Sequence, residues 1–297
     1  MTRVDGFEVL TLAGEIEATF VPSADMVCCS LRHRNEELLG QRGGLRRYVQ
    51  ERSTMGIPLL YPWANRVSAE RFQVAGREMV VDDAPSRDPN GLPIHGLLAG
   101  DGGWRVERFE DDTLVADFDF AERPDLLSAF PFPHRLRMEA RVSGARLTIA
   151  LAVLADRDSP VPISFGFHPY LKLPGAERRD WQIDVPVRER LVLDEDGIPT
   201  GERDPVKAEP GPLGDRTFDD AFTAPDAPFE LSGGGRTIAL SFEGGYPYSQ
   251  LYAPPDDDVV AFEPMTAPTN ALVRGGPELR VLEPGESYDA VFSIEVR

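Results

Sequence analysis

Two of the four histidines in this chain stand in segments where an ionisable ring would be shielded from water. His168 lies within the aromatic-rich segment Ser164–Tyr170, and the proline that follows it favours an extended backbone at His168. His95 lies among apolar residues in Leu92–Leu98, directly before a glycine that permits close backbone approach. Because imidazole titrates near neutral pH, either ring could serve as a catalytic acid or base, although a hydrogen-bonded structural role also fits the pattern.

One carboxylate stands out among the 50 acidic residues. Glu263 follows the apolar run Val259–Phe262 and precedes a proline, so its side chain is predicted to be buried. Burial would raise its pKa toward the range that suits a general base. The alternative is a carboxylate that pairs with an arginine for structural reasons.

The remaining histidines, His33 and His134, have arginine neighbours and are predicted to lie at the surface. The candidate ligands lack the i, i+2 or i, i+4 spacing of zinc-binding motifs, so we predict no metal site. The chain also lacks a Gly-rich phosphate loop and a GxSxG motif, which argues against phosphoryl and acyl transfer.

Composition limits the partners and the compartment. With 31 basic and 50 acidic residues, the net charge of −19 would repel nucleic acid and anionic membranes. The acidic N-terminal segment does not resemble a secretory signal. The only cysteines, Cys28 and Cys29, are adjacent, a spacing unfavourable for a structural disulfide. These features predict a cytoplasmic protein that binds neither nucleic acid nor membrane.

The elements that must position these residues are predicted to be strands. Apolar residues alternate with polar ones in four clear segments, 114–120, 147–153, 238–242 and 288–296. Turn signals such as Ser143-Gly144 and Gly233-Gly234-Gly235 separate the strands, and convincing helical patterns are nearly absent. We therefore predict an all-β protein of largely antiparallel strands in one domain, residues 1–297. The Pro- and Gly-rich stretch Asp194–Asp220 is predicted to be a long loop that helps to form the wall of a binding site.

Four main motifs occur in order along the chain: Gly56–Val67, Ile94–Gly96, Phe165–Tyr170 and Glu263–Asn270. Shorter pieces accompany them at Pro199–Glu202, Phe218–Phe222, Ser249–Tyr252 and Leu282–Glu286. No single motif is specific, but their order and spacing together are, and they span most of the chain. This ordered set resembles the aldose 1-epimerase family.

This resemblance implies a galactose mutarotase-like β-supersandwich that interconverts the α and β anomers of a free aldose without a cofactor. By resemblance, Glu263 would remove the proton from the anomeric O1 hydroxyl, and His168 would protonate the ring oxygen O5 as the C1–O5 bond breaks. Rotation about C1–C2 and reversal of both proton transfers would then close the opposite anomer. Residues at family positions that hold the sugar are Asn65, Arg66, His95, Asp219 and Gln250.

The chain departs from the family pattern in one segment and leaves alternatives open. Between Pro199–Glu202 and Phe218 it lacks the Asp-Phe-Arg motif found in many members, so loop contacts and the identity of the sugar are open. A hexose-6-phosphate 1-epimerase would need basic residues for the phosphate, for which Arg42, Arg46 and Arg47 are candidates. A sugar-binding module without turnover is the non-enzymatic alternative. The expected partner is a small-molecule sugar, and the expected state is a monomer or homodimer.

Overall fold

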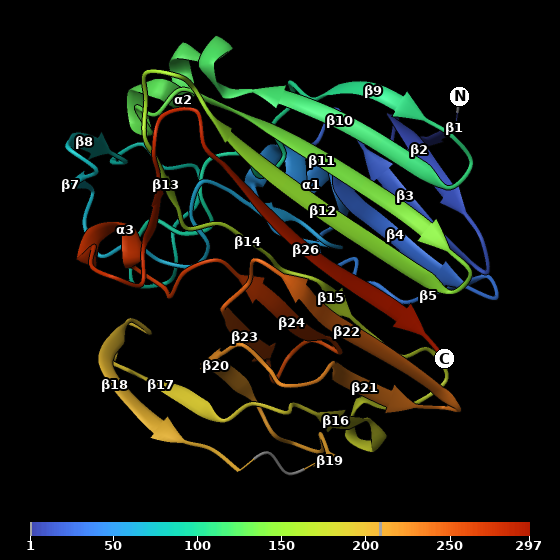
Figure 1. Ribbon diagram of the computed structural model, residues 1–297. Helices are drawn as coiled ribbons and strands as arrows, with labels where there is room; N and C mark the ends of the chain where they lie inside the picture. The colour runs from blue at the N-terminus through green and yellow to red at the C-terminus, as the bar shows by residue number, and fades with distance from the viewer. Residues whose placement is uncertain (1, 208–209) are drawn as a thin grey trace.

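The computed structural model describes residues 2–207 and 210–297, and strands dominate it. The largest sheet has nine strands and forms one layer of the molecule (Figure 1). From one edge to the other its strands are β19 (Gly211–Pro212), β16 (Gln182–Asp184), β21 (Phe229–Gly233), β22 (Arg236–Gly244), β26 (Ser287–Val296), β12 (Arg146–Ala155), β11 (His134–Ser143), β10 (Thr113–Asp119) and β9 (Arg105–Phe109).

A second sheet, of eight strands, contains residues of three of the four main motifs, those at 56–67, 165–170 and 263–270. Its strands run in the order β18 (Pro199–Pro205), β17 (Glu189–Leu193), β20 (Phe218–Thr223), β23 (Tyr248–Ala253), β24 (Val260–Met265), β14 (Gly166–Phe167) and β6 (Leu59–Leu60), and β15 (Tyr170–Leu171) also pairs with β24. The N-terminal sheet consists of β1 (Thr2–Val4), β2 (Phe7–Ala13), β3 (Ile16–Val21), β4 (Val27–His33) and β5 (Glu36–Glu37).

The remaining elements are short. Two strand pairs complete the β-structure, β7 (Arg71–Val74) with β8 (Arg77–Val80) and β13 (Val161–Ile163) with β25 (Arg280–Leu282). The helices are α1 (Gly44–Glu51), α2 (Pro124–Ala129) and α3 (Ala271–Arg274), with 3₁₀ turns at Phe120–Glu122 and Arg178–Asp180. Among the described residues, no helix has the length and apolar character that a membrane span requires.

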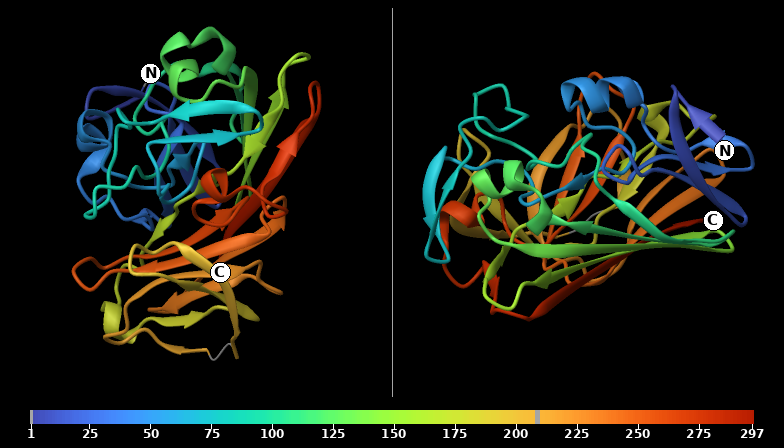
Figure 2. Two further views of the ribbon diagram at one scale, coloured as in Figure 1. Left: turned by 90° about the vertical axis from the view of Figure 1, so that its left-hand side faces the viewer. Right: turned by 90° about the horizontal axis from the view of Figure 1, so that it is seen from above.

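The core lies between the sheets, because the nine-stranded sheet buries one face against the other two. The N-terminal strands (blue) pack against one half of this sheet, and β17, β18, β20, β23 and β24 of the eight-stranded sheet (yellow to orange) lie at the other half (Figure 2). Aromatic side chains join the layers: the ring centroids of Phe167 and Phe292 are 5.0 Å apart, and those of Phe229 and Phe262 are 5.2 Å apart. Such pairs combine apolar burial with favourable ring geometry.

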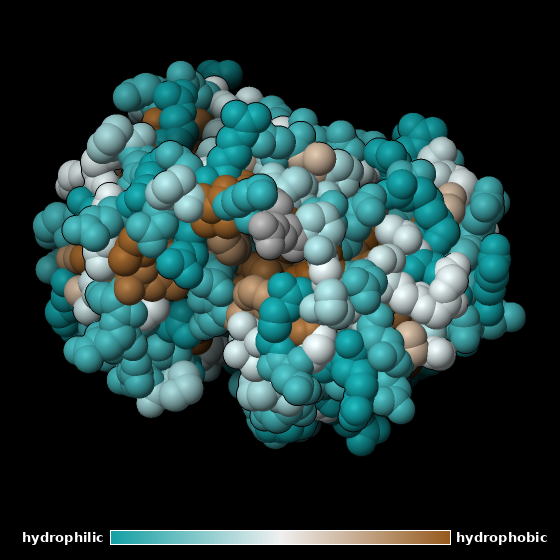
Figure 3. Space-filling view, turned by 90° about the horizontal axis from the view of Figure 1, so that it is seen from below, coloured by the Kyte–Doolittle hydropathy of each residue, from teal (hydrophilic) through white to brown (hydrophobic). Residues whose placement is uncertain are grey.

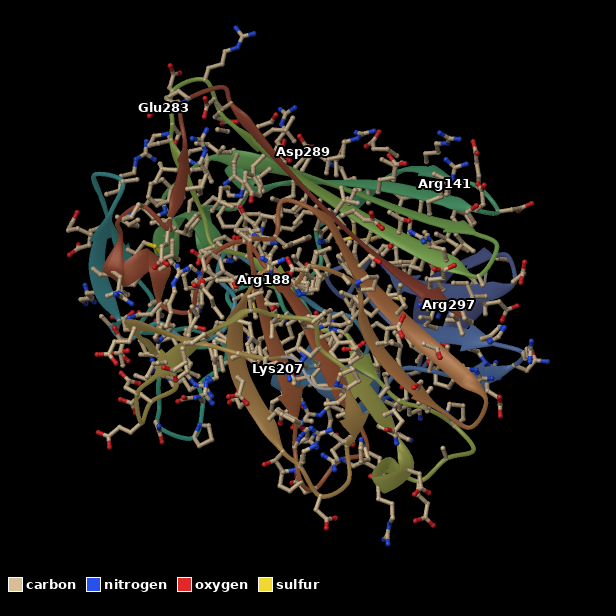
Figure 4. The ribbon with its side chains drawn as sticks, turned by 60° about the horizontal axis from the view of Figure 1, so that its bottom comes forward. Arg141, Arg188, Lys207, Glu283, Asp289 and Arg297 are labelled. Atoms are coloured by element: carbon tan, nitrogen blue, oxygen red, sulfur yellow. The ribbon has the colours of Figure 1, made fainter. Side chains whose placement is uncertain are left out.

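Strand periodicity is confirmed where the sequence alternates. Along β11 every second residue is buried, while Arg141 on β11 and Asp289 on β26 lie on the outer face (Figure 4). The predicted turn at Ser143-Gly144 joins β11 to β12, and the glycines near 234 join β21 to β22. Every pair of named strands in the described residues is antiparallel, as predicted. The surface seen from below is mostly hydrophilic, in keeping with the net charge (Figure 3).

Two predictions about local structure were wrong. Part of Asp194–Asp220 forms the edge strand β18, whose residues are almost all exposed; an edge strand facing solvent has little apolar alternation to reveal it. Residues 208–209 of that stretch lie outside the described residues. His33 and His134 are buried rather than exposed. Successive residues of a strand point to opposite faces, so exposed arginines beside these rings do not predict exposed histidines.

His134 supports the backbone near the first motif. It is completely buried, accepts or donates a 2.6 Å hydrogen bond with the Tyr61 hydroxyl, and stacks on Phe120. Gly96 approaches the same segment from the other side: its φ is +74°, and a Cβ there would lie 2.1 Å from the Tyr61 carbonyl oxygen. The chain can therefore pass close to Tyr61 only with a glycine at this position, next to His95.

Gly96→Ala is expected to destabilise the fold for two reasons: the left-handed backbone at this position and the clash of the new Cβ with the Tyr61 carbonyl. Gly76 has nearly the same φ of +76° but nothing within 4 Å of an added Cβ, so Gly76→Ala is the matched control. The control should lose about 1–2 kcal/mol of unfolding free energy from its backbone conformation, and Gly96→Ala should lose clearly more. Urea denaturation measures both, and equal losses would show that the close approach to Tyr61 is unimportant.

Candidate active site

A cavity of about 410 Å³ opens onto one face of the eight-stranded sheet. The strand register predicts which side chains face it, because cross-strand partners and alternate residues share a face. Asp219 pairs with Tyr252, and Gln250 pairs with Glu263, which places these four side chains on one face of β20, β23 and β24. Other lining residues come from the end of α1 and from the loops around this face: Arg42, Glu51–Thr54, Asn65, Arg66, Pro85–Pro89, Ile94 and His95.

The same register brings His168 opposite Glu263. On one side of His168, Gly166 pairs with Met265; on the other, Tyr170 pairs with Ala261. Continued through the intervening residues, this antiparallel register pairs residue 168 with residue 263. The side chains meet: His168 Nε2 lies 3.2 Å from Glu263 Oε1.

Burial governs the protonation of this pair. The two side chains are only 6% and 2% exposed. Burial, reinforced by the neighbouring His95 and the positive charge of Arg42, lowers the pKa of His168 well below its ordinary value. Burial, with a smaller contribution from Asp219 and opposed by Arg66, raises the pKa of Glu263 well above its ordinary value. Each group alone therefore favours its neutral form, whereas their contact favours opposite charges.

One side-chain atom of each residue in the pair lacks a hydrogen-bond partner among the described residues. Glu263 Oε2 and His168 Nδ1 are buried and have no hydrogen-bond partner within the described part of the chain, and the same holds for His95 Nδ1. Buried polar atoms without partners are uncommon in folded proteins and are costly unless a bound group satisfies them. Their clustering in this cavity fits a polar ligand.

Arg66 links two acidic residues at the rim of the site. Its Nε lies 2.8 Å from Asp88 Oδ2, and its Nη2 lies 3.6 Å from Asp219 Oδ2. Asp88 also accepts backbone N–H bonds from Asn90 and Leu92. Burial alone would raise the pKa of Asp88, but the hydrogen bond from Arg66 holds this pKa below its ordinary value.

His95 and Asn65 hold unusual backbone conformations at the cavity. Their φ angles are +63° and +54°, in the left-handed region that side chains other than glycine disfavour. The backbone N–H of His95 donates to the Asn65 carbonyl, which couples the two segments. The His95 ring lies edge-on to His168 with centroids 5.7 Å apart, and burial lowers the pKa of His95 to about 3. His95 is therefore a neutral hydrogen-bonding group at physiological pH.

Six of the seven predicted site residues line the cavity directly: Asn65, Arg66, His95, His168, Asp219 and Glu263. The seventh, Gln250, lies beneath them and donates a 2.6 Å hydrogen bond from Nε2 to Asp219 Oδ1. Gln250 is only 3% exposed, so its role in the site is to hold Asp219 through this hydrogen bond. Within the described residues, no group of three or more His, Cys, Asp or Glu side chains is arranged to hold a metal ion.

Sequence reasoning missed other residues of the site. Asp88 lies in an Arg-Asp-Pro-Asn-Gly turn, whose composition indicates only a surface loop. Tyr170 belongs to the motif that contains His168, but nothing in the sequence marks its hydroxyl. Of the three arginines that the sequence offers for phosphate binding, Arg42 lines the cavity, whereas Arg46 and Arg47 lie on α1 and are not among its lining residues.

These features define a class of protein: a galactose mutarotase-like β-supersandwich with a buried histidine–glutamate pair on one sheet face. The model of the aldose 1-epimerase family matches residues 28–295, and the chain belongs to that family. A curated relative, the uncharacterized protein YphB of Escherichia coli, is 28% identical over 119 residues, which span 40% of this chain and 38% of that protein.

Solved structures confirm the predicted fold. A putative aldose 1-epimerase from Escherichia coli K12 is similar with a TM-score of 0.77 and 21% identity, over 98% of this chain and 99% of that one. A galactose mutarotase-like protein from Clostridium acetobutylicum has a TM-score of 0.81 and 17% identity, over 96% and 93% of the two chains. A galactose 1-epimerase from Lactobacillus acidophilus has a TM-score of 0.75 and 16% identity, over 100% and 97%.

The two ion pairs of Arg66 are expected to differ in strength. The Asp88 side chain is 2% exposed and that of Asp219 is 49% exposed. Asp88→Asn, which leaves a nearly buried guanidinium without its main charge partner, should lower the unfolding free energy by about 1.5–3 kcal/mol. Asp219→Asn, the matched control, should change it by less than about 1 kcal/mol because water screens that pair. Urea denaturation at pH 7 compares them, and a larger loss for Asp219→Asn would contradict this ranking.

Proposed function

We propose that the protein is an aldose 1-epimerase that interconverts the anomers of a free, uncharged sugar. The observation that carries this proposal is the 3.2 Å contact between His168 Nε2 and Glu263 Oε1 inside a cavity lined by polar groups. In a cyclic aldose, the anomeric hydroxyl O1 and the ring oxygen O5 are bonded to the same carbon. An acid and a base that serve these two atoms must therefore be close neighbours.

Ring opening needs one proton to leave O1 and one to reach O5. Glu263 as carboxylate accepts the O1 proton, and His168 as imidazolium donates its proton to O5 while the C1–O5 bond breaks. The product is the open-chain hydroxy aldehyde, with a neutral imidazole and a carboxylic acid beside it. After rotation about C1–C2, the O5 hydroxyl returns its proton to His168 as it attacks the other face of the aldehyde. Glu263 then gives its proton back to O1.

The surrounding residues suit the binding of sugar hydroxyls. Arg66 and neutral His95 offer donors near the pair, and the Asp219 carboxylate, held by Gln250, offers acceptors. Arg66 also provides positive charge where negative charge develops at an oxygen during ring opening. The unpartnered Nδ1 of His95 gives a further polar contact for the substrate.

The charges of the cavity favour an uncharged sugar over a phosphorylated one. Its lining contains four arginines and four acidic residues, so the formal charges balance: Arg42, Arg52, Arg66 and Arg87 against Glu51, Asp88, Asp219 and Glu263. Three of these arginines already pair with carboxylates, namely Arg42 with Asp257, Arg66 with Asp88 and Arg87 with Glu70. A competition experiment with free and 6-phosphorylated hexoses tests this preference, and tighter, salt-dependent binding of the phosphate would contradict it.

Glu263→Gln is expected to lower kcat by roughly 10²- to 10⁴-fold, because the amide cannot accept the O1 proton. His168→Asn should lower kcat by a comparable factor. Both variants should remain nearly as stable as the wild-type protein. Anomer exchange measured by saturation-transfer NMR, with the uncatalysed rate subtracted, is the readout. Full activity of either variant would refute the assignment, and a wild-type protein that binds sugar without exchange would be a sugar-binding module.

The pH profile of kcat should show a broad plateau, because the pair is active when it holds one proton. At low pH it takes up a second proton and becomes positive; at high pH it loses the last and becomes negative. Burial disfavours both charged states: it lowers the pKa of His168 and raises that of Glu263. The acid limb should therefore lie below the ordinary histidine pKa of about 6.5, and the alkaline limb above the ordinary glutamate pKa of about 4.3. A rate that is still rising above pH 6.5 would contradict this reasoning.

A further inference from the structure

His168 lacks the hydrogen bond that usually orients a catalytic histidine. In most such sites the second ring nitrogen donates to a carboxylate or carbonyl, which fixes the tautomer and the ring orientation. Here Nε2 contacts Glu263, and Nδ1 is buried without a hydrogen-bond partner in the described residues. The contact to Glu263 alone leaves the ring free to rotate about it, so another interaction must orient the imidazole.

Aromatic rings surround His168 and supply that interaction. The Tyr170 ring stacks on the imidazole with centroids 4.1 Å apart and planes within 19°. His95 and Tyr252 approach its edges, with centroid distances of 5.7 Å and 5.6 Å. Stacking with Tyr170 follows from the strand, because residues two apart lie on the same face.

Tyr170 is itself held rigidly. Its hydroxyl lies 2.6 Å from Thr54 Oγ1 and accepts a 2.8 Å hydrogen bond from Arg42 Nη1. The Arg42 guanidinium also lies 4.7 Å from the centroid of the same ring and contacts Asp257 at 3.3 Å. The phenol oxygen thus has a donor and a hydroxyl partner from the protein, and the ring lies between Arg42 and His168.

We propose that Tyr170, anchored by Thr54 and Arg42, is the positioning residue that holds the His168 imidazole in the orientation needed for proton transfer to O5. This inference rests on the proposed epimerase function. Proton donation depends on the direction of the Nε2–H bond, and small misplacements of a catalytic group cost up to about 100-fold in rate. The stacked ring resists rotation of the imidazole without using its second nitrogen.

A direct contact between Tyr170 and the sugar is the competing explanation, since Tyr170 also lines the cavity. The two roles differ kinetically. Loss of a sugar contact used equally in the ground and transition states raises KM, whereas misorientation of the acid lowers kcat. The hydroxyl, which already has two protein partners, favours the positioning role.

The experiment compares Tyr170→Leu, which removes the stacked ring, with Tyr170→Phe, which keeps the ring but frees it from Thr54 and Arg42. Tyr288→Phe is the matched control. It also removes a tyrosine hydroxyl that makes a hydrogen bond, here to the Gly245 carbonyl, but Tyr288 lies on β26, outside the cavity. We expect kcat to fall about 10- to 100-fold in Tyr170→Leu and by less than about tenfold in Tyr170→Phe, with KM nearly constant. The control should keep the wild-type kcat.

NMR signals of the His168 ring provide a readout independent of turnover. Charged and titratable groups that face this ring are Glu263, His95 and Arg42, with Tyr170 and Tyr252 beside it. Both Tyr170 variants, but not Tyr288→Phe, should shift the ring signals and their titration. If Tyr170→Leu does not fold, the kcat and His168 signals of Tyr170→Phe alone test the proposal.

The proposal is overturned if Tyr170→Phe matches Tyr288→Phe in both kcat and His168 signals, or if the main effect of the Tyr170 variants is on KM. A wild-type protein without anomer exchange would refute the epimerase function instead. The ring signals of Tyr170→Phe, which keeps an aromatic ring at position 170, would still show whether the anchored Tyr170 orients His168.

Discussion

His168 and Glu263 are held in contact where neither side chain has ready access to water. Two ionisable groups 3.2 Å apart, both almost fully buried, can share one proton without placing net charge in the core. During ring opening His168 gives a proton to the sugar and Glu263 takes one from it, so the net charge of the pair is zero before and after. A buried site that had to create a charge would face a desolvation cost of several kcal/mol per ion. This pair avoids that cost because its two one-proton forms are both neutral overall.

Sheet register is what maintains that contact. Glu263 lies in the centre of β24, a strand buried along its whole length, between His168 on one side and Gln250 on the other. A slip of one residue would turn Glu263 to the opposite face and break the alignment with His168. The nine-stranded sheet prevents this slip indirectly, since rings such as Phe262 and Phe229 interlock the two layers. The packing of the core and the chemistry of the site therefore depend on the same strand.

The sequence predicted the strands with clear alternation and, through the ordered motifs, the residues that gather in the cavity. The sequence was misleading where the same polar pattern occurs both in exposed loops and in strands. Arg135 beside His134 suggested a surface position, but neighbouring residues on a strand face opposite ways, and the His134 ring is buried against Phe120. The edge strand β18 has the polar composition of a loop. Asp88 lies in an ordinary turn, and its pairing with Arg66 depends on a fold that brings residues 22 positions apart together.

The charges around the pair determine which of its two neutral forms prevails. Arg66 favours the glutamate anion, while Asp219 and burial oppose it; Arg42 and His95 oppose the imidazolium. The form with a neutral imidazole and a protonated carboxyl is thus favoured by burial, and the ionic form by the short contact between the groups. A sugar that replaces this contact with bonds to O1 and O5 has to preserve the ionic form at the moment of reaction. Arg66 is placed to do so, because it lines the cavity with its Nε fixed by Asp88 and its Nη2 near Asp219.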